Sequence, residues 1–312
     1  MAMFVSTSKL GVDVSKDWID IFDGKSAHQI GNNYSEIETF FQSLGGPTEL
    51  AVEPTNRYHR ELVSCAVAAG HTVYLVDPFR VSRYRDAIGI RAKTDPIDAR
   101  LLYRYLEAEG HRLKAFTPAP EIVQRVLDLL RARAKLTQAQ VALKQSLKGV
   151  ELLEDGMKAV DEALAITIDS ISRQLMRLIR QSDHHDYFLS CLSIPGIGPL
   201  NAAGLLAIFH RGNFRRADAF IAYLGLDVRV RDSGYYRGKR KLTKRGNAEM
   251  RRLLFNAARA GARTPYWKKY YQSLLERGFS TTAATVALAR KMARVAFALM
   301  RDKAQFQAIL AK

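Results

Sequence analysis

The segment that decides the fold is residues 10–32, LGVDVSKDWIDIFDGKSAHQIGN. Short runs rich in β-branched and aromatic residues lie at 10–14 and 18–22, and a turn of Asp, Gly and Lys follows at 23–25. Residues 27–32 can return as a third strand. The start of the chain is therefore predicted to form three hairpin-linked strands.

After residue 32 the pattern alternates between helices and strands. A capping-box pattern, Ser35-Glu36-Ile37-Glu38, predicts the start of a helix that ends at Gly45-Gly46. A strand at 49–53, a helix at 60–69 and a strand at 71–76 follow. The predicted order is three strands followed by a helix, a strand, a helix, a strand and a helix. This is the element order of the RNase H-like fold, so we expect an α/β layer with a mixed sheet.

Long helical periodicity begins near residue 118 and continues to residue 183. Apolar residues recur every three or four positions from Val123 and again from Leu164, and Gly149 and Gly156 mark a turn between the two stripes. This pattern predicts an antiparallel helical pair. It can be a coiled-coil arm that acts as a spacer or an oligomerisation element, or a plain bundle that buries its own stripe.

The remaining residues, 190–312, are predicted to be mainly helical. At about 150 residues per domain, 312 residues allow at least two domains with real cores. The predicted organisation is an α/β domain with the RNase H-like element order at 1–115, a helical coiled-coil arm at 116–188 and a basic domain at 189–312.

The composition excludes several classes of protein. Hydrophobic residues make up 47% of the chain and charged residues 25%, which is ordinary globular composition. The longest apolar stretch, 283–299, contains Arg290, Lys291 and Arg294, and residues 1–9 lack signal-peptide features. We therefore expect a cytoplasmic protein with no membrane partner. Two cysteines are too few for a disulfide framework or zinc knuckle, so any metal would be held by oxygen.

The positive charge is concentrated in the last third of the chain. The net charge is +17, but residues 191–312 hold 24 basic and 6 acidic residues, whereas residues 1–110 hold 12 and 15. A segment this basic attracts polyanions, and nucleic acid is the commonest in a cell. A solubilising surface or attraction to anionic lipid would not explain the acidic domain that precedes it.

Four carboxylates of the first domain form the first candidate site. Asp13 lies in the first strand, Glu53 ends the fourth, and Asp95 and Asp98 lie where Pro96 predicts the start of a helix. If the fold brings them together, Mg²⁺ or Mn²⁺ would relieve their repulsion. The alternative is structural: Asp95 as an N-cap and Asp98 as a first-turn acid would stabilise a helix by about 1 kcal/mol.

The basic segment holds two further candidates. The turn Ser193-Ile194-Pro195-Gly196-Ile197-Gly198 can present backbone N–H groups to a phosphate, as in a helix-hairpin-helix element, and Gly196 and Gly198 are its key positions. Ser233 lies before a glycine in a loop dense with cations, where it can be a turn residue, a phosphate ligand or a nucleophile. The cations predicted to contact nucleic acid are Arg229, Arg231, Arg237, Lys239, Arg240, Lys241, Lys244 and Arg245.

Downstream helices interleave cations with aromatic residues. Arg251 and Arg252 are followed by Tyr266-Trp267-Lys268-Lys269-Tyr270-Tyr271, which suits backbone contact and base stacking on nucleic acid. The structural alternative is a solvated face over a core stripe that contains Leu253 and Leu254.

These motifs together resemble the DEDD transposases, the family of the Piv-like DNA invertases and the insertion-sequence family one-ten recombinases. The resemblance covers nearly the whole chain in order, and its most specific block is Lys93-Thr94-Asp95-Pro96-Ile97-Asp98-Ala99. Asn56 stands where many members carry glycine, and residues 226–228 replace a proline-bearing stretch. The matching segments are 11–16, 53–59, 91–100, 194–198, 232–234, and 246–247 with 253–254.

The resemblance implies that residues 1–115 form a RuvC-like metal-binding catalytic domain and residues 189–312 a transposase domain with the nucleophilic serine. It implies that Asp13, Glu53, Asp95 and Asp98 carry a Mg²⁺ site and that Ser233 is a nucleophile that forms a phosphoserine link to DNA. The implied partners are double-stranded DNA at element ends and target, and a homo-oligomer, dimer or tetramer; some members are guided by a bridge RNA. The expected activity is that of a transposase or site-specific recombinase of an insertion sequence.

Three alternatives stay open from the sequence. The chain can be a Piv-like DNA invertase, or a RuvC-like structure-selective nuclease that uses water as its nucleophile while Ser233 binds phosphate. It can also be a nucleic-acid architectural protein whose carboxylates are helix caps.

Overall fold

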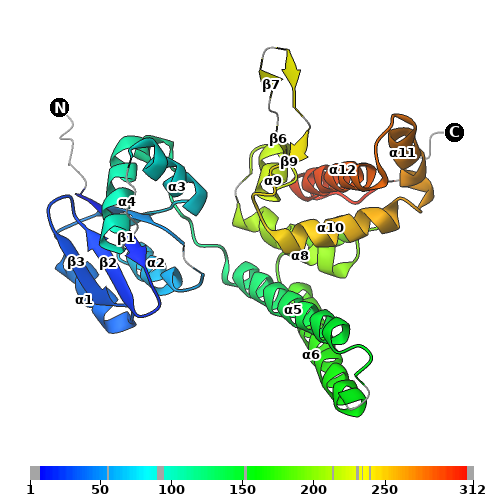
Figure 1. Cartoon of the computed structure of the whole chain (residues 1–312), viewed down its shortest axis with the longest axis horizontal. Coiled ribbons are helices and arrows are strands. Elements are labelled where there is room, and N and C mark those ends of the chain that lie inside the picture. The colour runs from blue at the N-terminus through cyan, green and yellow to red at the C-terminus, as the bar shows by residue number, and fades with distance from the viewer. Residues whose placement is uncertain are drawn as a thin grey trace. The chain divides into compact units, whose positions relative to one another are not determined.

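The computed structural model describes residues 8–54, 56–89, 95–150, 153–212, 214–229, 232–233, 235–238 and 240–307, and only the backbone of residues 95, 96, 232, 236 and 237. The chain divides into two compact units at residues 118 and 119 (Figure 1). The helical pair that follows residue 118 belongs to the second unit. Among the described helices, none combines the length and the apolar character needed to cross a bilayer.

The first unit contains a five-stranded mixed sheet of order β3-β2-β1-β4-β5. β1 pairs antiparallel with β2, which pairs antiparallel with β3, whereas β4 runs parallel to both β1 and β5. The predicted strands are confirmed within one or two residues. Their bounds are β1 Ser8–Val14, β2 Trp18–Phe22, β3 Ala27–Gly31, β4 Thr48–Val52 and β5 Thr72–Leu75.

Helices cover both faces of this sheet. Alternate residues such as Val12, Ile19 and Val52 face one core with α1 and α2, and Ala51 faces the other core with α3 and α4. Successive side chains of a strand point to opposite faces of the sheet, so each strand contributes to both cores. The helices are α1 Tyr34–Ser43, α2 His59–Ala68, α3 Pro78–Ala87 and α4 Asp95–Glu109, followed by the 3₁₀ turn η1 Gly110–Arg112.

The cap of α1 differs from the prediction. The Asn33 side chain accepts a hydrogen bond from the Glu36 N–H, and Glu36 Oε2 in turn accepts one from the Gly31 N–H at 2.6 Å. The capping pair is therefore Asn33 with Glu36, and the prediction that Ser35 opens the helix was wrong. Asn is as good an N-cap as Ser, and here it comes two residues earlier.

A long antiparallel helical pair begins the second unit, as predicted. Its helices are α5, Glu121–Ser146, and α6, Glu154–Arg180, which extend as an arm from the other helices of the unit (Figure 1). The predicted α5 stripe is buried, including Val123 and Leu130. Gly149 lies in the turn with φ +83°, but Gly156 lies inside α6, so its assignment to the turn was wrong.

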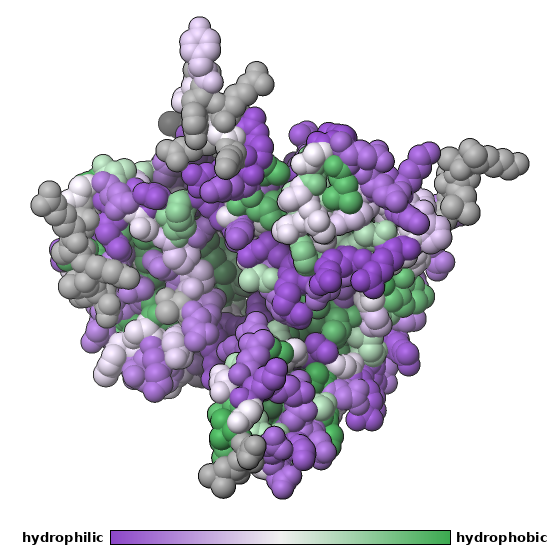
Figure 2. All heavy atoms as spheres, turned by 45° about the vertical axis from the view of Figure 1, so that its right-hand side comes forward, coloured by the Kyte–Doolittle hydropathy of each residue, from purple (hydrophilic) through white to green (hydrophobic). Residues whose placement is uncertain are grey.

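The rest of the second unit is mainly helical and has one large core. Short strands interrupt it, and the β7–β8 hairpin extends away from the helices (Figure 1). The helices are α7 His185–Leu192, α8 Pro199–Arg211, α9 Ala217–Tyr223, α10 Ala248–Gly261, α11 Pro265–Glu276 and α12 Thr281–Asp302, and the strands are β6 Val228–Arg229, β7 Asp232–Ser233, β8 Tyr236–Arg237 and β9 Lys241–Leu242. Figure 2 shows a face on which hydrophilic residues predominate.

Candidate active site

Two of the predicted carboxylates lie at the same end of neighbouring strands in the first unit's sheet. Val12 of β1 is the register partner of Val52 of β4, so Asp13 and Glu53, each one residue further on, are neighbours at the same end of parallel strands. Val12 and Val52 face the α1–α2 core. Since side chains alternate along a strand, Asp13 points to the opposite face, the one covered by α4, whereas Glu53 lies just past the end of β4.

A glycine lets α4 approach this face closely. A Cβ built on Gly11 would lie 2.0 Å from the carbonyl oxygen of Ala99 and 2.3 Å from the backbone nitrogen of Tyr103. Both atoms belong to the backbone of α4, so only glycine fits at this position. The first turns of α4 therefore pass directly over β1, which brings Asp98 to the side of the sheet that carries Asp13.

The Asp98 side chain is buried and paired with an arginine. Nη2 of Arg85, from α3, lies 2.5 Å from Oδ1 of Asp98, and their side chains are 15% and 8% exposed. A buried carboxylate needs such a compensating positive charge. Arg85 was not singled out from the sequence, because nothing in the spacing of 85 and 98 signals that α3 and α4 pack together.

Asp20 is a second acid that the sequence reasoning missed. It is the register partner of Asp13 across the antiparallel β1–β2 pair, so both point to the α4 face. Asp20 is 6% exposed, and its Oδ1 accepts a hydrogen bond from Nε2 of Gln29 at 3.1 Å. Ile19 and Ile21 are buried on the opposite face, so alternation along β2 alone predicts a solvent-facing Asp20, and nothing in the sequence signals that α4 covers it.

Asp95 opens α4, but its side chain lies outside the described part of the chain. Among the side chains that the structure describes, no three of His, Cys, Asp and Glu are grouped closely enough to hold one metal ion. The predicted donors nevertheless suit a hard cation in kind, because all are carboxylates. The Asp98 carboxylate is already compensated by the Arg85 guanidinium.

The turn after Glu53 tolerates its unusual residue. Asn56 has a φ of +45°, in the left-handed region that favours glycine. Asparagine is the residue that enters this region at least cost after glycine. The replacement of glycine by Asn56 therefore preserves the turn that leads away from Glu53.

Ser233 lies on the β7–β8 hairpin of the second unit. Ser233 is exposed and is the register partner of Tyr236, and the neighbouring Tyr235 is fully exposed. A serine on such a hairpin is accessible to a large substrate.

The predicted cations surround the base of this hairpin. β6 and β9 pair through Arg229 and Lys241, and Thr243 hydrogen-bonds to Asp227 by both its backbone N–H and its hydroxyl. The exposed cations of this region are Arg229, Arg240, Lys241, Lys244 and Arg245. Arg231, Lys239 and the side chain of Arg237 lie outside the described residues.

The Pro-Gly-Ile-Gly turn between α7 and α8 has a packing role. Gly196 has a φ of +92°, and a Cβ there would lie 2.6 Å from Cα of Gly261 in α10. The Trp267 indole, 1% exposed, donates a hydrogen bond to the Pro195 carbonyl at 2.9 Å. Trp267 is thus a core residue, and the suggestion that it stacks on bases was wrong. Gly198, the N-cap of α8, has open space around it.

Comparisons with known proteins identify the family of the chain. A model of the Transposase IS116/IS110/IS902 family matches residues 191–272, and a transposase model of the IS110 DEDD type matches residues 10–154. The carboxylates of the first unit and the serine hairpin of the second both lie inside these matches. The class of protein is thus a transposase, a kind of DNA-cutting enzyme, and the chain belongs to the IS110/IS116 transposase family.

Relatives match over nearly their whole length. The pilin gene-inverting protein of Moraxella lacunata is 27% identical over 320 residues, which cover 97% of this chain and 98% of the relative. A probable family 20 transposase of Pseudomonas aeruginosa is 26% identical, with coverage of 95% and 97%. An uncharacterized 44.8 kDa protein of insertion element IS116 from Streptomyces clavuligerus is 28% identical over 192 residues, 59% of this chain and 46% of the relative.

Proposed function

We propose that the chain is a DNA recombinase that cuts and rejoins DNA through Ser233, assisted by a divalent cation held by the first unit. The observation that supports the proposal is the close approach of α4 to Gly11, since α4 carries Asp98 and Gly11 lies on the same sheet face as Asp13. Acidic side chains concentrated in this way are costly unless positive charge compensates them.

The proposal includes an RNase H-like identity for the first unit. Three antiparallel strands followed by two parallel strands, in the order β3-β2-β1-β4-β5 with helices on both faces, support it. The predicted division into a catalytic domain at 1–115, an arm at 116–188 and a basic domain at 189–312 is retained as part of this proposal.

Asp13, Glu53, Asp95 and Asp98 would hold Mg²⁺ or Mn²⁺. When bound, such an ion neutralises the phosphate charge that develops during displacement. Asp20, beside Asp13, adds negative charge to the same face, and Arg85 sets the orientation of Asp98. In the structure Asp98 is paired with Arg85, so cation binding is expected to loosen this pair.

Ser233 would act as the nucleophile. Its hydroxyl loses a proton, its oxygen bonds to phosphorus, and the bond from phosphorus to one deoxyribose oxygen breaks, so that this oxygen leaves as a hydroxyl. Attack by the freed hydroxyl of another strand reverses the step and releases Ser233. The exposed hairpin and its cations suit this role, since backbone phosphates position DNA through such contacts.

The partners follow from the same proposal. They are double-stranded DNA at the element ends and target, other copies of this chain in a dimer or tetramer, and a bridge RNA as in some members of the family. Location in the cytoplasm with the DNA belongs to the proposal as well. Inversion of a DNA segment is the second candidate activity, because the pilin gene-inverting relatives match nearly the whole chain.

A covalent-adduct assay tests the proposal. The full chain is incubated with end-labelled DNA from the ends of its own element and Mg²⁺, and denaturing gels are used to detect protein-linked label. We expect an adduct with wild type and with Tyr235→Phe, which removes the exposed neighbouring hydroxyl, and none with Ser233→Ala or Asp13→Asn. Cleaved ends that carry no protein, with activity retained in Ser233→Ala, would show that water is the nucleophile.

A further inference from the structure

A pocket with one cationic wall lies in the second unit, where α6 meets the start of α8. Its volume is about 650 Å³. Arg173, Arg177 and Arg180 of α6 line it, together with the apolar side chains of Met176 and Leu200. The hairpin site described above uses none of these residues.

The three arginines form one row. They are spaced by four and three residues, which places them on one face of α6 over two turns. Arg173 forms an exposed ion pair with Asp169 at 3.0 Å. Arg177 and Arg180 have no ion pair within the described part of the chain, and none of the described residues lining the pocket is acidic. Two of the three cations on the wall, Arg177 and Arg180, are therefore without an acidic partner among the described residues, whereas Arg173 is paired with Asp169.

The beginning of α8 adds positive potential to the same pocket. Pro199 and Leu200 are its first two helical residues, and both line the pocket. Gly198, the N-cap, provides no side-chain hydrogen bond to the helix. Pro199 has no N–H group, so the helix begins with the N–H groups of Leu200 and Asn201, to which the N-cap supplies no side-chain acceptor, at the end where the macrodipole is positive.

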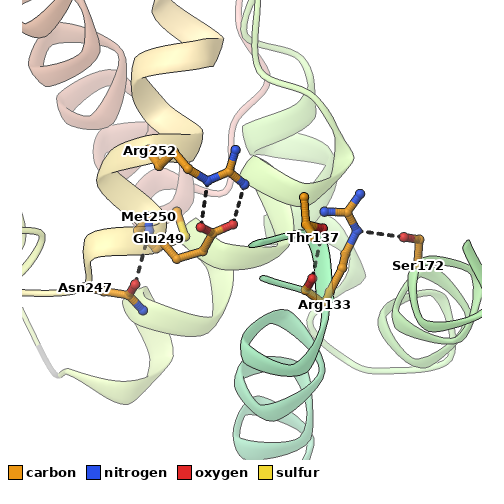
Figure 3. Close-up of polar contacts among 7 residues, drawn as sticks. All are labelled: Arg133, Thr137, Ser172, Asn247, Glu249, Met250 and Arg252. Carbon is orange, nitrogen blue, oxygen red and sulfur yellow. Dashed lines mark hydrogen bonds and ion pairs between the residues drawn. The ribbon is translucent and has the colours of Figure 1, made fainter. Parts of the chain in front are cut away.

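A fourth arginine, from α5, contacts a residue that lines the pocket. Nε of Arg133 donates a hydrogen bond to Oγ of Ser172 at 2.9 Å, and Ser172 lines the pocket (Figure 3). Burial, together with the like charge of Arg252, lowers the pKa of Arg133 below its ordinary value. Glu249 forms a two-bond ion pair with Arg252 at 2.8 and 2.6 Å, and so is already engaged (Figure 3).

We propose that this pocket binds a phosphodiester of the DNA backbone, as a contact separate from the serine hairpin. The arginine row suits the phosphate, because guanidinium groups bind phosphate oxygens with two parallel hydrogen bonds. Met176 and Leu200 suit the apolar edge of the adjoining deoxyribose. The choice of DNA as the ligand rests on the proposed recombinase function, whereas the affinity for a phosphate group follows from the residues that line the pocket.

Fluorescence anisotropy with the full chain tests this contact. The probe is a fluorescein-labelled 30-base-pair DNA duplex without added metal, so binding is measured apart from cleavage. Arg177→Gln/Arg180→Gln is compared with Lys158→Gln, a change of cation to amide near the other end of α6, where Lys158 is 70% exposed. Circular dichroism and melting temperature check that each variant folds.

The pocket variant is expected to bind the duplex about 10-fold more weakly, and the slope of log affinity against log salt should fall by about 2, one for each lost phosphate contact. Lys158→Gln should bind as wild type does. Equal affinity and slope in the pocket variant and Lys158→Gln would overturn the proposal. Loss confined to a 30-nucleotide RNA of the same sequence would also overturn it. If wild type binds DNA through the pocket but forms no adduct, the recombinase proposal fails while this one stands.

Discussion

The prediction that tests the packing of the active site is Gly11→Ala. Its added methyl group would lie 2.0 Å from the Ala99 carbonyl oxygen and 2.3 Å from the Tyr103 nitrogen. Ordinary contacts are near 3.5 Å, so α4 would have to move away from β1 by roughly 1 Å or more. Because both atoms are helix backbone, no side-chain rotation relieves the clash.

The expected cost follows from two opposing effects. Overpacking of this kind costs about 1–3 kcal/mol, and two backbone clashes place Gly11→Ala at the upper end. Alanine in place of glycine in a strand regains about 0.5–1 kcal/mol of chain entropy. The free energy of unfolding of the first unit should fall by about 2 kcal/mol in total. This corresponds to roughly 30-fold faster hydrogen exchange through opening of that unit.

Hydrogen exchange measured by mass spectrometry on the full chain separates the two units. Peptides from β1 and α4 should exchange faster in Gly11→Ala, while peptides from α12 serve as an internal reference. Gly45→Ala is the matched control, because a Cβ there meets nothing within 4 Å. Unchanged exchange of β1 and α4 in Gly11→Ala would refute the close approach on which the site depends.

Three further predictions follow from single contacts. Arg85→Ala should lower the free energy of unfolding by about 3 kcal/mol, since it leaves Asp98 buried without its partner. Mn²⁺ should restore part of the lost melting temperature. An unchanged free energy of unfolding in metal-free buffer would contradict the buried pair. Burial and the neighbouring His184 lower the pKa of His210 to about 4, so stability should fall as pH drops from about 6.5 toward 4, and His210→Phe should remove this slope in urea titrations. Asn56→Val should destabilise the first unit by about 1–2 kcal/mol while Asn56→Gly leaves its melting temperature nearly unchanged, and equal melting of the two would contradict the left-handed turn.

The sheet could be predicted because its pattern is local. Runs such as 18–22 and 49–53 combine β-branched residues with turn signals at their ends, and all five strands were found. The cap at Asn33 and the helical position of Gly156 could not be read, because several polar residues and glycines offered equivalent boundaries and packing chose among them.

The site was predictable only in part. Asp13, Glu53 and Asp98 could be singled out because acids in or beside apolar strands, or at a helix start, are conspicuous in sequence; their role in a metal site stays a prediction. Asp20 was missed because an acid alternating with isoleucines reads as the exposed face of a strand, and only the packing of α4 buries it. Trp267 looked like a stacking residue, but its contact with Pro195 depends on the packing of segments 72 residues apart.

The most direct test of the cation site is anomalous diffraction from crystals of the full chain soaked in Mn²⁺. The account predicts a manganese peak bounded by carboxylate oxygens of Asp13, Glu53 and Asp98, and its loss in Asp13→Asn crystals. A structure with no peak on this face of the sheet, in which Asp98 still pairs with Arg85, would contradict the account.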